Sequence, residues 1–184
     1  MEILKQREWT DAELYKQGFR RYERKKTVVL ARELPAAEAP KRIKTTWDTL
    51  VAHAGYMICY DVSDGKKHSS IDSYNHWPVE PGIFLKTYRK WEYTTPWTPN
   101  PAEQHLLESG CKPYFKVAGV WAKKLRRPHW IISRESVEPV LVPPGAWIAI
   151  GIEGEPFSMS AAQFTARYER SATTTRSRTV SASQ

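Results

Sequence analysis

The spacing of hydrophobic and polar residues changes near residue 26, so the start of the chain contains two kinds of element. Thr10 and Glu13 have the spacing of a capping box, in which each side chain bonds the other residue's backbone amide. Apolar side chains then fall near one helical face, at Leu14, Tyr15, Phe19 and Tyr22. This pattern predicts an amphipathic helix over about residues 11–25, within an N-terminal segment 1–26.

Residues 27–91 have the spacing of short β-strands. The β-rich runs are at residues 27–34, 43–51, 56–62 and 74–79, and the Pro/Ala/Glu stretch at 35–40 predicts a turn or loop. Pro81 then suits the first position of a short helix that continues to Tyr88. We therefore expect a small β-rich module that is closed by a helix.

Residues 92–110 separate this module from the rest of the chain. Pro96 and Pro99 stiffen a connector, and Asn100 followed by Pro101 has the pattern of a helix start. Gly110 suits the position just after the helix. The pattern predicts a Pro-rich connector and a helix over 101–109.

Residues 111–170 repeat the pattern of the first module. At an offset of 91 residues, a first set of positions recurs: Val29, Ala31 and Leu34 as Val120, Ala122 and Leu125, and Leu50 and Tyr56 as Leu141 and Trp147. At an offset of 80, Trp77, Phe84 and Tyr88 recur as Phe157, Phe164 and Tyr168. Because 91 exceeds 80 by 11, the first copy has an 11-residue insertion, near residues 63–73.

These patterns predict an α+β protein with two related small β-rich modules, each closed by a short helix, and an N-terminal amphipathic helix. The two modules are expected to pack as a pseudo-dimer, since two copies are too few to stack as a solenoid. Residues 171–184 are mostly Ser, Thr, Ala and Arg, and so predict a flexible tail.

The second copy also resembles a known family. Residues 142–157 (VPPGAWIAIGIEGEPF), followed by Phe164-x-x-x-Tyr168-Glu169, are similar to the PGDYG-type modules of bacterial and phage proteins, with Ala146 in place of the Asp. The first copy has a degenerate version of the motif. The resemblance implies a turn, a strand, a Gly-Glu hairpin and a closing helix, and it implies no activity and no catalytic residues.

Composition restricts the classes of function. No apolar run approaches the roughly 20 residues that span a bilayer, and the N-terminus lacks the apolar core of a secretion signal. Only two cysteines are present, Cys59 and Cys111, which fits a reducing compartment. We therefore expect a cytoplasmic protein that does not bind membranes.

Several kinds of chemistry lack their usual sequence signatures. The chain has no Walker A run, no Gly-x-Gly-x-x-Gly, no zinc-ligand spacing and no serine-hydrolase elbow. We expect no cofactor. The insertion and its flanks hold polar residues at Asp61, Asp64, His68, Asp72 and His76. These residue types can ligate a metal or exchange protons, but a solvent-exposed hairpin is the preferred interpretation of their spacing, so no metal site is favoured.

A charge of +8 and eight Trp residues point towards binding. The candidate ligand-binding residues are Lys123, Lys124, Arg126, Arg127 and Trp130, together with Trp97 from the connector. Cations and rings in this pattern can hold an anion or a nucleic acid, or they can form a solvated face and an intermodule core. The favoured hypothesis is a non-enzymatic binding or adaptor protein for a protein partner or an anionic small ligand. The alternatives are a nucleic-acid-binding protein and a small enzyme with an acid–base or metal site at residues 61–76.

Overall fold

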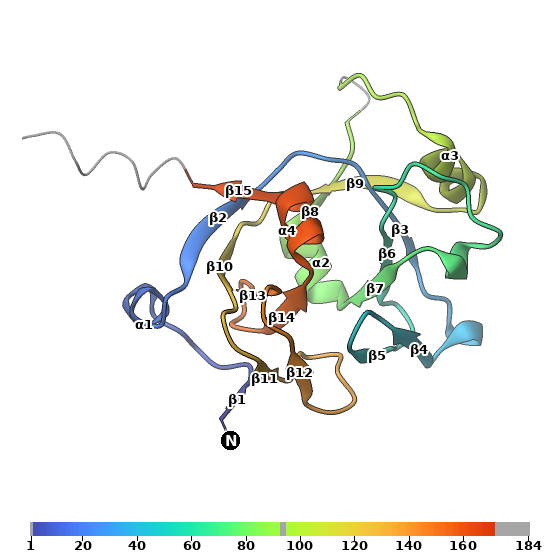
Figure 1. Ribbon diagram of the computed structural model, residues 1–184. Coiled ribbons are helices and arrows are strands. Elements are labelled where there is room, and N and C mark those ends of the chain that lie inside the picture. The colour runs from blue at the N-terminus through green and yellow to red at the C-terminus, as the bar shows by residue number, and fades with distance from the viewer. Residues whose placement is uncertain (1, 93–94, 172–184) are drawn as a thin grey trace, which may run out of the picture.

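The computed structural model describes residues 2–92 and 95–171, and in these ranges the protein is a mixed α+β structure dominated by antiparallel strands (Figure 1). The predicted flexible tail lies outside the described residues, apart from Ser171. None of the helices in the described ranges is long and apolar enough to cross a membrane.

Two five-stranded antiparallel sheets form the body of the molecule. The first has the order β7-β6-β3-β9-β8, formed by His76–Val79, Met57–Tyr60, Val29–Glu33, Lys112–Lys116 and Tyr88–Lys90. The second has the order β14-β13-β10-β2-β15, formed by Pro156–Met159, Trp147–Ile150, Val120–Lys124, Arg20–Arg24 and Tyr168–Arg170. Strands were expected at most of these places, but not at β2, β8, β9 or β15.

Each sheet contains one strand from the opposite half of the chain. Strand β2 directly precedes β3 in the sequence, but it pairs with β10 and β15 of the second sheet. Strand β9 directly precedes β10, but it pairs with β3 and β8 of the first sheet. The two sheets are therefore joined by two exchanged strands, and each exchanged strand has a neighbour on both sides.

The remaining strands form two smaller, separate sheets. A hairpin is formed by β4 (Lys41–Lys44) and β5 (Thr49–Ala52), so the single strand expected over 43–51 is wrong. The reason is a turn in which the Thr45 amide donates to the Asp48 carbonyl and the Thr45 hydroxyl accepts from the Asp48 amide. A three-stranded sheet contains β1 (Ile3–Leu4), β11 (His129–Ile131) and β12 (Val140–Val142).

Four α-helices are found in the described ranges, and three begin with complete capping boxes. Thr10 caps α1 (Asp11–Lys16), Asn100 caps α3 (Pro101–Glu108) and Ser160 caps α4 (Ala161–Arg167). The remaining helix, α2 (Pro81–Thr87), begins with proline as predicted. Short 3-10 helices cover Ala36–Glu38 and Ile71–Ser73.

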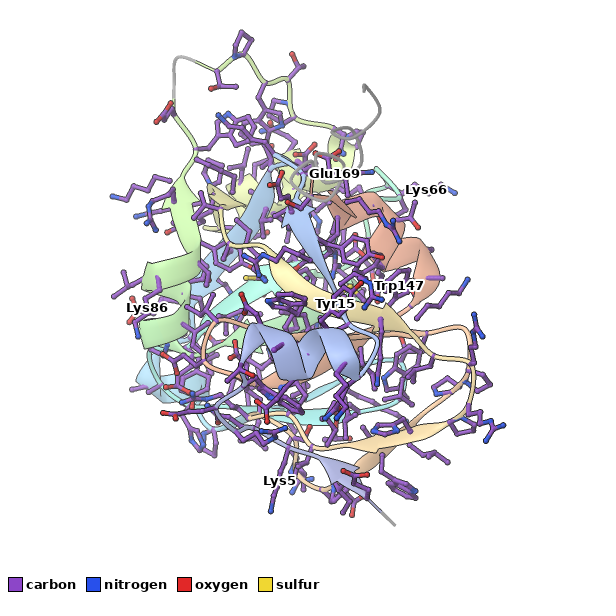
Figure 2. All side chains as sticks on the ribbon, turned by 90° about the vertical axis from the view of Figure 1, so that its left-hand side faces the viewer. Lys5, Tyr15, Lys66, Lys86, Trp147 and Glu169 are labelled. Atoms are coloured by element: carbon purple, nitrogen blue, oxygen red, sulfur yellow. The ribbon has the colours of Figure 1, made fainter. Side chains whose placement is uncertain are left out.

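The helix predicted over 11–25 is much shorter than expected. It ends at Lys16, and Gly18 follows with a φ of +89°. In this left-handed conformation the amides of Gly18 and Phe19 turn back to the carbonyls of Tyr15 and Leu14, which ends the helix. Figure 2 looks onto α1, where Tyr15 lies on the outer side and is 59% exposed.

Strands β3 and β10, at the centres of the two large sheets, have apolar residues packed on both faces. In β3, Val29 and Ala31 pack with Phe84 and Tyr88 beside α2, whereas Leu30 faces a second cluster that includes Leu106 of α3. Alternate residues of strand β10 also pack on opposite faces. Val120 and Ala122 pack beside α4, and Trp121 packs against the cluster that contains Leu14 of α1. In Figure 1, α2 and α4 lie towards the centre of the molecule, where the two halves meet.

Candidate ligand-binding pocket

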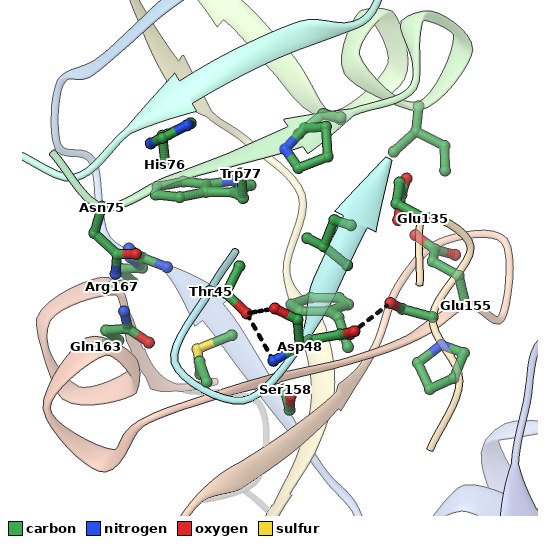
Figure 3. Close-up of a pocket in the computed structure, with 18 of the residues that line it drawn as sticks. Thr45, Asp48, Asn75, His76, Trp77, Glu135, Glu155, Ser158, Gln163 and Arg167 are labelled. Atoms are coloured by element: carbon green, nitrogen blue, oxygen red, sulfur yellow. Dashed lines mark hydrogen bonds between the residues drawn. The ribbon is translucent and has the colours of Figure 1, made fainter. Parts of the chain in front are cut away.

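A cavity of about 180 Å³ lies where the two halves of the chain meet. It is lined by Trp77 of β7 and Phe157 of β14, by residues of α2 and α4, and by the β4–β5 turn. In Figure 3, Asn75, Gln163 and Arg167 gather at one end, Glu135 and Glu155 lie at the other, and Asp48 lies between them. The pocket therefore has polar groups of different charge at its two ends.

Three cationic side chains that line the pocket lie around Tyr168. Arg24 is the last residue of β2 and Lys116 is the last residue of β9, so the two exchanged strands each deliver one cation. The third is Arg167, at the end of α4. Its guanidinium lies 4.4 Å from the centroid of the Trp77 ring, and its Nη2 lies 3.5 Å from an oxygen of Asp61.

Arg24 is only partly satisfied by the protein. Its Nη1 donates to the Arg167 carbonyl at 2.9 Å, but its Nε is buried without a hydrogen-bond partner. Within residues 2–92 and 95–171, no carboxylate lies within 4.0 Å of the charged nitrogens of Arg24 or Lys116. Burial lowers the pKa of Arg24, because the charged guanidinium loses its hydration.

The pKa values of two buried tyrosines, Tyr88 and Tyr168, are shifted in opposite directions. Burial raises the pKa of Tyr88 well above its usual value. Burial has the same effect on Tyr168, but nearby Lys116 and Arg24 outweigh it and lower the pKa of Tyr168 overall. The Lys116 ammonium also donates a hydrogen bond of 3.1 Å to the Tyr168 hydroxyl. Lys116 and Arg24 therefore favour a negative charge close to the Tyr168 hydroxyl.

The second end of the pocket carries the carboxylates Glu135 and Glu155, and Asp48 lies beside it. Burial raises the pKa of Glu135 to about 7, and it also raises the pKa values of Asp48 and Glu155. Glu155 is held by the Glu153 amide at 2.8 Å. Asp48 Oδ2 accepts from the Ser136 hydroxyl at 2.7 Å, but Asp48 Oδ1 is buried without a partner.

Aromatic rings form the body of the pocket. Trp47 lies in the β4–β5 turn, and its indole Nε1 donates to the Ser158 hydroxyl at 2.6 Å. Trp77 and Phe157 occupy matching positions in the edge strands of the two sheets. Flat apolar walls between polar ends are typical of sites for small molecules.

Neither Cys59 nor Cys111 is among the residues that line the pocket. Burial raises the pKa of Cys59 to about 12 and that of Cys111 to about 11, so both thiols stay protonated at neutral pH. The only histidine that lines the pocket in the described part of the chain is His76. Its Nδ1 bonds the Tyr74 carbonyl, and its ring stacks on Tyr60.

The basic residues that the sequence singled out lie elsewhere. Lys124, Arg126 and Arg127 are exposed around the β10–β11 turn. Lys123 differs from them, because its ammonium donates to the Gln17 carbonyl and lies 4.4 Å from the centroid of the Phe19 ring. Three of the four predicted cations therefore form one exposed group, and none of the four lines the pocket.

The two predicted tryptophans are not brought together. Trp97 donates to the Glu103 carboxylate and packs on the apolar cluster of the first sheet. Trp130 lies in β11, paired with Ile3 and Leu141. Trp97 therefore belongs to a different part of the molecule from the basic turn.

The polar residues of the insertion are bonded to separate partners. His68 Nε2 lies 2.8 Å from an oxygen of Asp64, and Asp72 pairs with Lys41 at 2.7 Å. His76 bonds a backbone carbonyl instead. The described residues contain no group of three or more His, Cys, Asp or Glu side chains placed to hold a metal.

Sequence reasoning missed Arg24 and Lys116. A cation at the end of a strand resembles an ordinary solvent-facing residue, and Arg24 fell within the helix expected over residues 11–25. A signal was nevertheless present, because Tyr-x-Arg at residues 22–24 recurs as Tyr-x-Lys at 114–116. Both motifs lie on exchanged strands, and each ends in a pocket-lining cation.

Comparison of the chain with protein-family models, with curated protein sequences and with solved structures finds no match.

Proposed function

We propose that this protein is a non-enzymatic binding protein whose central pocket takes a small anionic ligand. The observation that carries the proposal is the buried Arg24 Nε, which has no partner, in a pocket also lined by Lys116 and Arg167. A buried cation without a counterion costs free energy, and a bound anion offsets that cost. The pocket shape supports a small molecule rather than a flat protein surface.

The second support is the arrangement of the two halves. We propose that the chain consists of two related modules, as the repeated sequence pattern predicts. The exchanged strands β2 and β9 occupy corresponding places in the two sheet orders, and α1 and α3 precede them in the same way. A site at the junction of two such modules receives one cation from each. The PGDYG resemblance and a cytoplasmic location stay predictions.

A matched pair of probes tests the anionic ligand. We expect 4-methylbenzoate to bind, with Trp77 and Phe157 along its ring and its carboxylate at Arg24. Its neutral isostere 4-methylbenzamide should bind at least tenfold more weakly, because it lacks the charge-assisted hydrogen bonds. Binding is measured by titration of amide NMR signals, which detects millimolar dissociation constants.

Two substitutions locate the site. Arg24→Gln removes the one of the three pocket cations whose Nε is buried without a partner, and it should reduce the preference for the benzoate over the benzamide to threefold or less. Arg126→Gln removes an exposed cation outside the pocket and should leave the preference unchanged. Equal binding of the two probes by the unaltered protein contradicts the proposal, as does an Arg126→Gln effect equal to that of Arg24→Gln.

A further inference from the structure

The carboxylate end of the pocket contains a buried acceptor without a donor. Burial raises the pKa of Asp48, which is 8% exposed, and the Thr49 backbone amide partly opposes this effect. Asp48 Oδ2 accepts a hydrogen bond from Ser136 at 2.7 Å and a weaker one from Ser133 at 3.5 Å. Its Oδ1 is one of three buried side-chain polar atoms without a partner in the described residues. Another of the three is Arg24 Nε, and both residues line the same pocket.

The surroundings of this end have a surplus of negative charge. Glu135 and Glu155 line the pocket, and Glu80 and Glu153 lie close behind them. Two cations act on this end: Lys116 lies near enough to partly oppose the effect of burial on the pKa of Glu155, and Arg134 already pairs with Glu80 and Glu153, at 2.7 Å each. Lys86 also pairs with Glu153, which leaves Glu135 without a cationic partner within 4.0 Å among the described residues.

The size of the cavity limits what can reach both ends. Its volume of about 180 Å³ is slightly larger than the ~150 Å³ of an engineered protein cavity that holds benzene. The available space therefore fits one six-membered ring with short substituents. A single ring can lie along Trp77 and Phe157 with one substituent directed at each end.

We propose that the ligand is a small monocyclic zwitterion, with its anionic group at Arg24 and a protonated amine at Asp48 and Glu135. This inference rests on the proposed function, and it adds the second half of the recognition. An ammonium group supplies three donors and a positive charge. An ammonium can therefore donate a hydrogen bond to Asp48 Oδ1 and also neutralise negative charge at Glu135. A neutral donor can supply the hydrogen bond but cannot neutralise the charge.

The test uses probes that differ only in the amine. The zwitterions are 4-(aminomethyl)benzoate and 4-(2-aminoethyl)benzoate, which place the ammonium at two distances from the ring. Their amine-free partners are 4-methylbenzoate and 4-ethylbenzoate. We expect at least one zwitterion to bind about tenfold more tightly than its partner, the gain typical of hydrogen bonds between charged groups. Amide NMR titration of the full chain at pH 8 measures the four dissociation constants.

Isosteric variants assign the gain to the two carboxylates. Asp48→Asn and Glu135→Gln should each reduce the advantage of the zwitterion to threefold or less. The advantage is a ratio of two dissociation constants measured on the same variant, so a uniform change in affinity for benzoates cancels, and cooperative unfolding in urea shows that each variant is folded. Glu138→Gln, an exposed neighbour outside the pocket, is the matched control and should leave the advantage unchanged.

The outcomes separate this inference from the proposed function. If the benzoates bind but neither zwitterion exceeds its amine-free partner, the zwitterion is excluded and the anion site stands. If none of the four probes binds, the proposed function fails with it. An advantage that survives both Asp48→Asn and Glu135→Gln also overturns the assignment of the amine to this end.

Discussion

The rings of Tyr22 and Phe164 meet edge to face, with 4.9 Å between their centroids and an interplanar angle of 85°. Tyr22 lies on the exchanged strand β2, and Phe164 lies on α4 near the end of the described chain. Tyr114 of β9 meets Phe84 of α2 in nearly the same way, at 5.0 Å and 83°. Each exchanged strand is thus fixed to the closing helix of the sheet that it enters.

Removal of the Tyr22 ring should destabilise the whole protein. Tyr22 is buried against Trp147 and Phe164, so Tyr22→Ala leaves a cavity and loses two aromatic contacts. We expect the free energy of unfolding to fall by about 3 kcal/mol, as measured by urea denaturation. Tyr15→Ala is the control, since Tyr15 is mainly exposed and its loss should cost about 0.5 kcal/mol or less.

Division of the chain in its connector should leave neither half able to fold alone. A chain of residues 1–94 lacks β9, which lies between β3 and β8, and a chain of residues 95–184 lacks β2, which lies between β10 and β15. We expect each half alone to show no cooperative unfolding by circular dichroism. The two halves produced together should copurify and unfold in one transition. Cooperative unfolding of either half by itself contradicts this prediction.

Stability should depend on pH through Glu135. Burial raises the folded-state pKa of Glu135 to about 7, in a setting that includes Arg134, Glu80 and Glu155. The neutral form is therefore favoured on folding. The contribution of neutral Glu135 to the free energy of unfolding is complete below the unfolded-state pKa of about 4.5. This contribution is lost as the pH rises through the folded-state pKa of about 7.

Glu135→Gln mimics the neutral form at every pH. We expect this variant to be more stable than the unaltered protein at pH 8, by roughly 1–3 kcal/mol, and equally stable at pH 4. Urea denaturation at the two pH values measures the difference. Glu138→Gln, at an exposed position, should show no such change with pH.

Arg24 should be more important for binding than for stability. Its guanidinium is desolvated, and it makes one hydrogen bond, to the Arg167 carbonyl. An apolar side chain of similar length avoids the desolvation, so Arg24→Met should leave the free energy of unfolding unchanged or raise it by about 1 kcal/mol. A loss of more than 2 kcal/mol on urea denaturation would show that Arg24 is mainly structural.

The exposed basic turn should be independent of the pocket. Simultaneous reversal of Lys124, Arg126 and Arg127 to Glu should leave the affinity for 4-methylbenzoate unchanged, because none of the three lines the cavity. Lys123 is excluded from this variant because it is bonded to Gln17. If an oligonucleotide binds the unaltered protein only, with an affinity that falls steeply with salt, the nucleic-acid alternative is supported.

Local rules predicted the parts of the fold that depend on a few neighbouring residues. The capping box at Thr10, the helix start at Asn100 and Pro101 and the proline start of α2 are confirmed. The length of α1 was wrong because apolar spacing at Phe19 and Tyr22 fits a helix and a strand almost equally. The positive φ at Gly18 ends the helix, and pairing with β10 then determines the conformation of the following residues.

The pocket was not predicted, because it depends on long-range pairing. Arg24 and Lys116 are 92 residues apart, and both reach the pocket through strands that leave their own half of the chain. Alternation within a strand shows which face a residue occupies but does not show which sheet the strand joins. Asp48 was missed for a similar reason, because its burial depends on Ser133 and Ser136 from the opposite half.

The exchanged strands also restrict how a ligand can reach the pocket. Proteins that close like a clamshell rotate two domains about a few flexible residues. Here the two sheets are joined by two short crossing segments, residues 25–28 between β2 and β3 and residues 117–119 between β9 and β10, so such a rotation has to bend both segments at once. The spacing between the walls that carry Trp77 and Phe157 is thereby restricted, and we expect ligand exchange to depend on local displacement of the β4–β5 turn, which carries both Trp47 and Asp48.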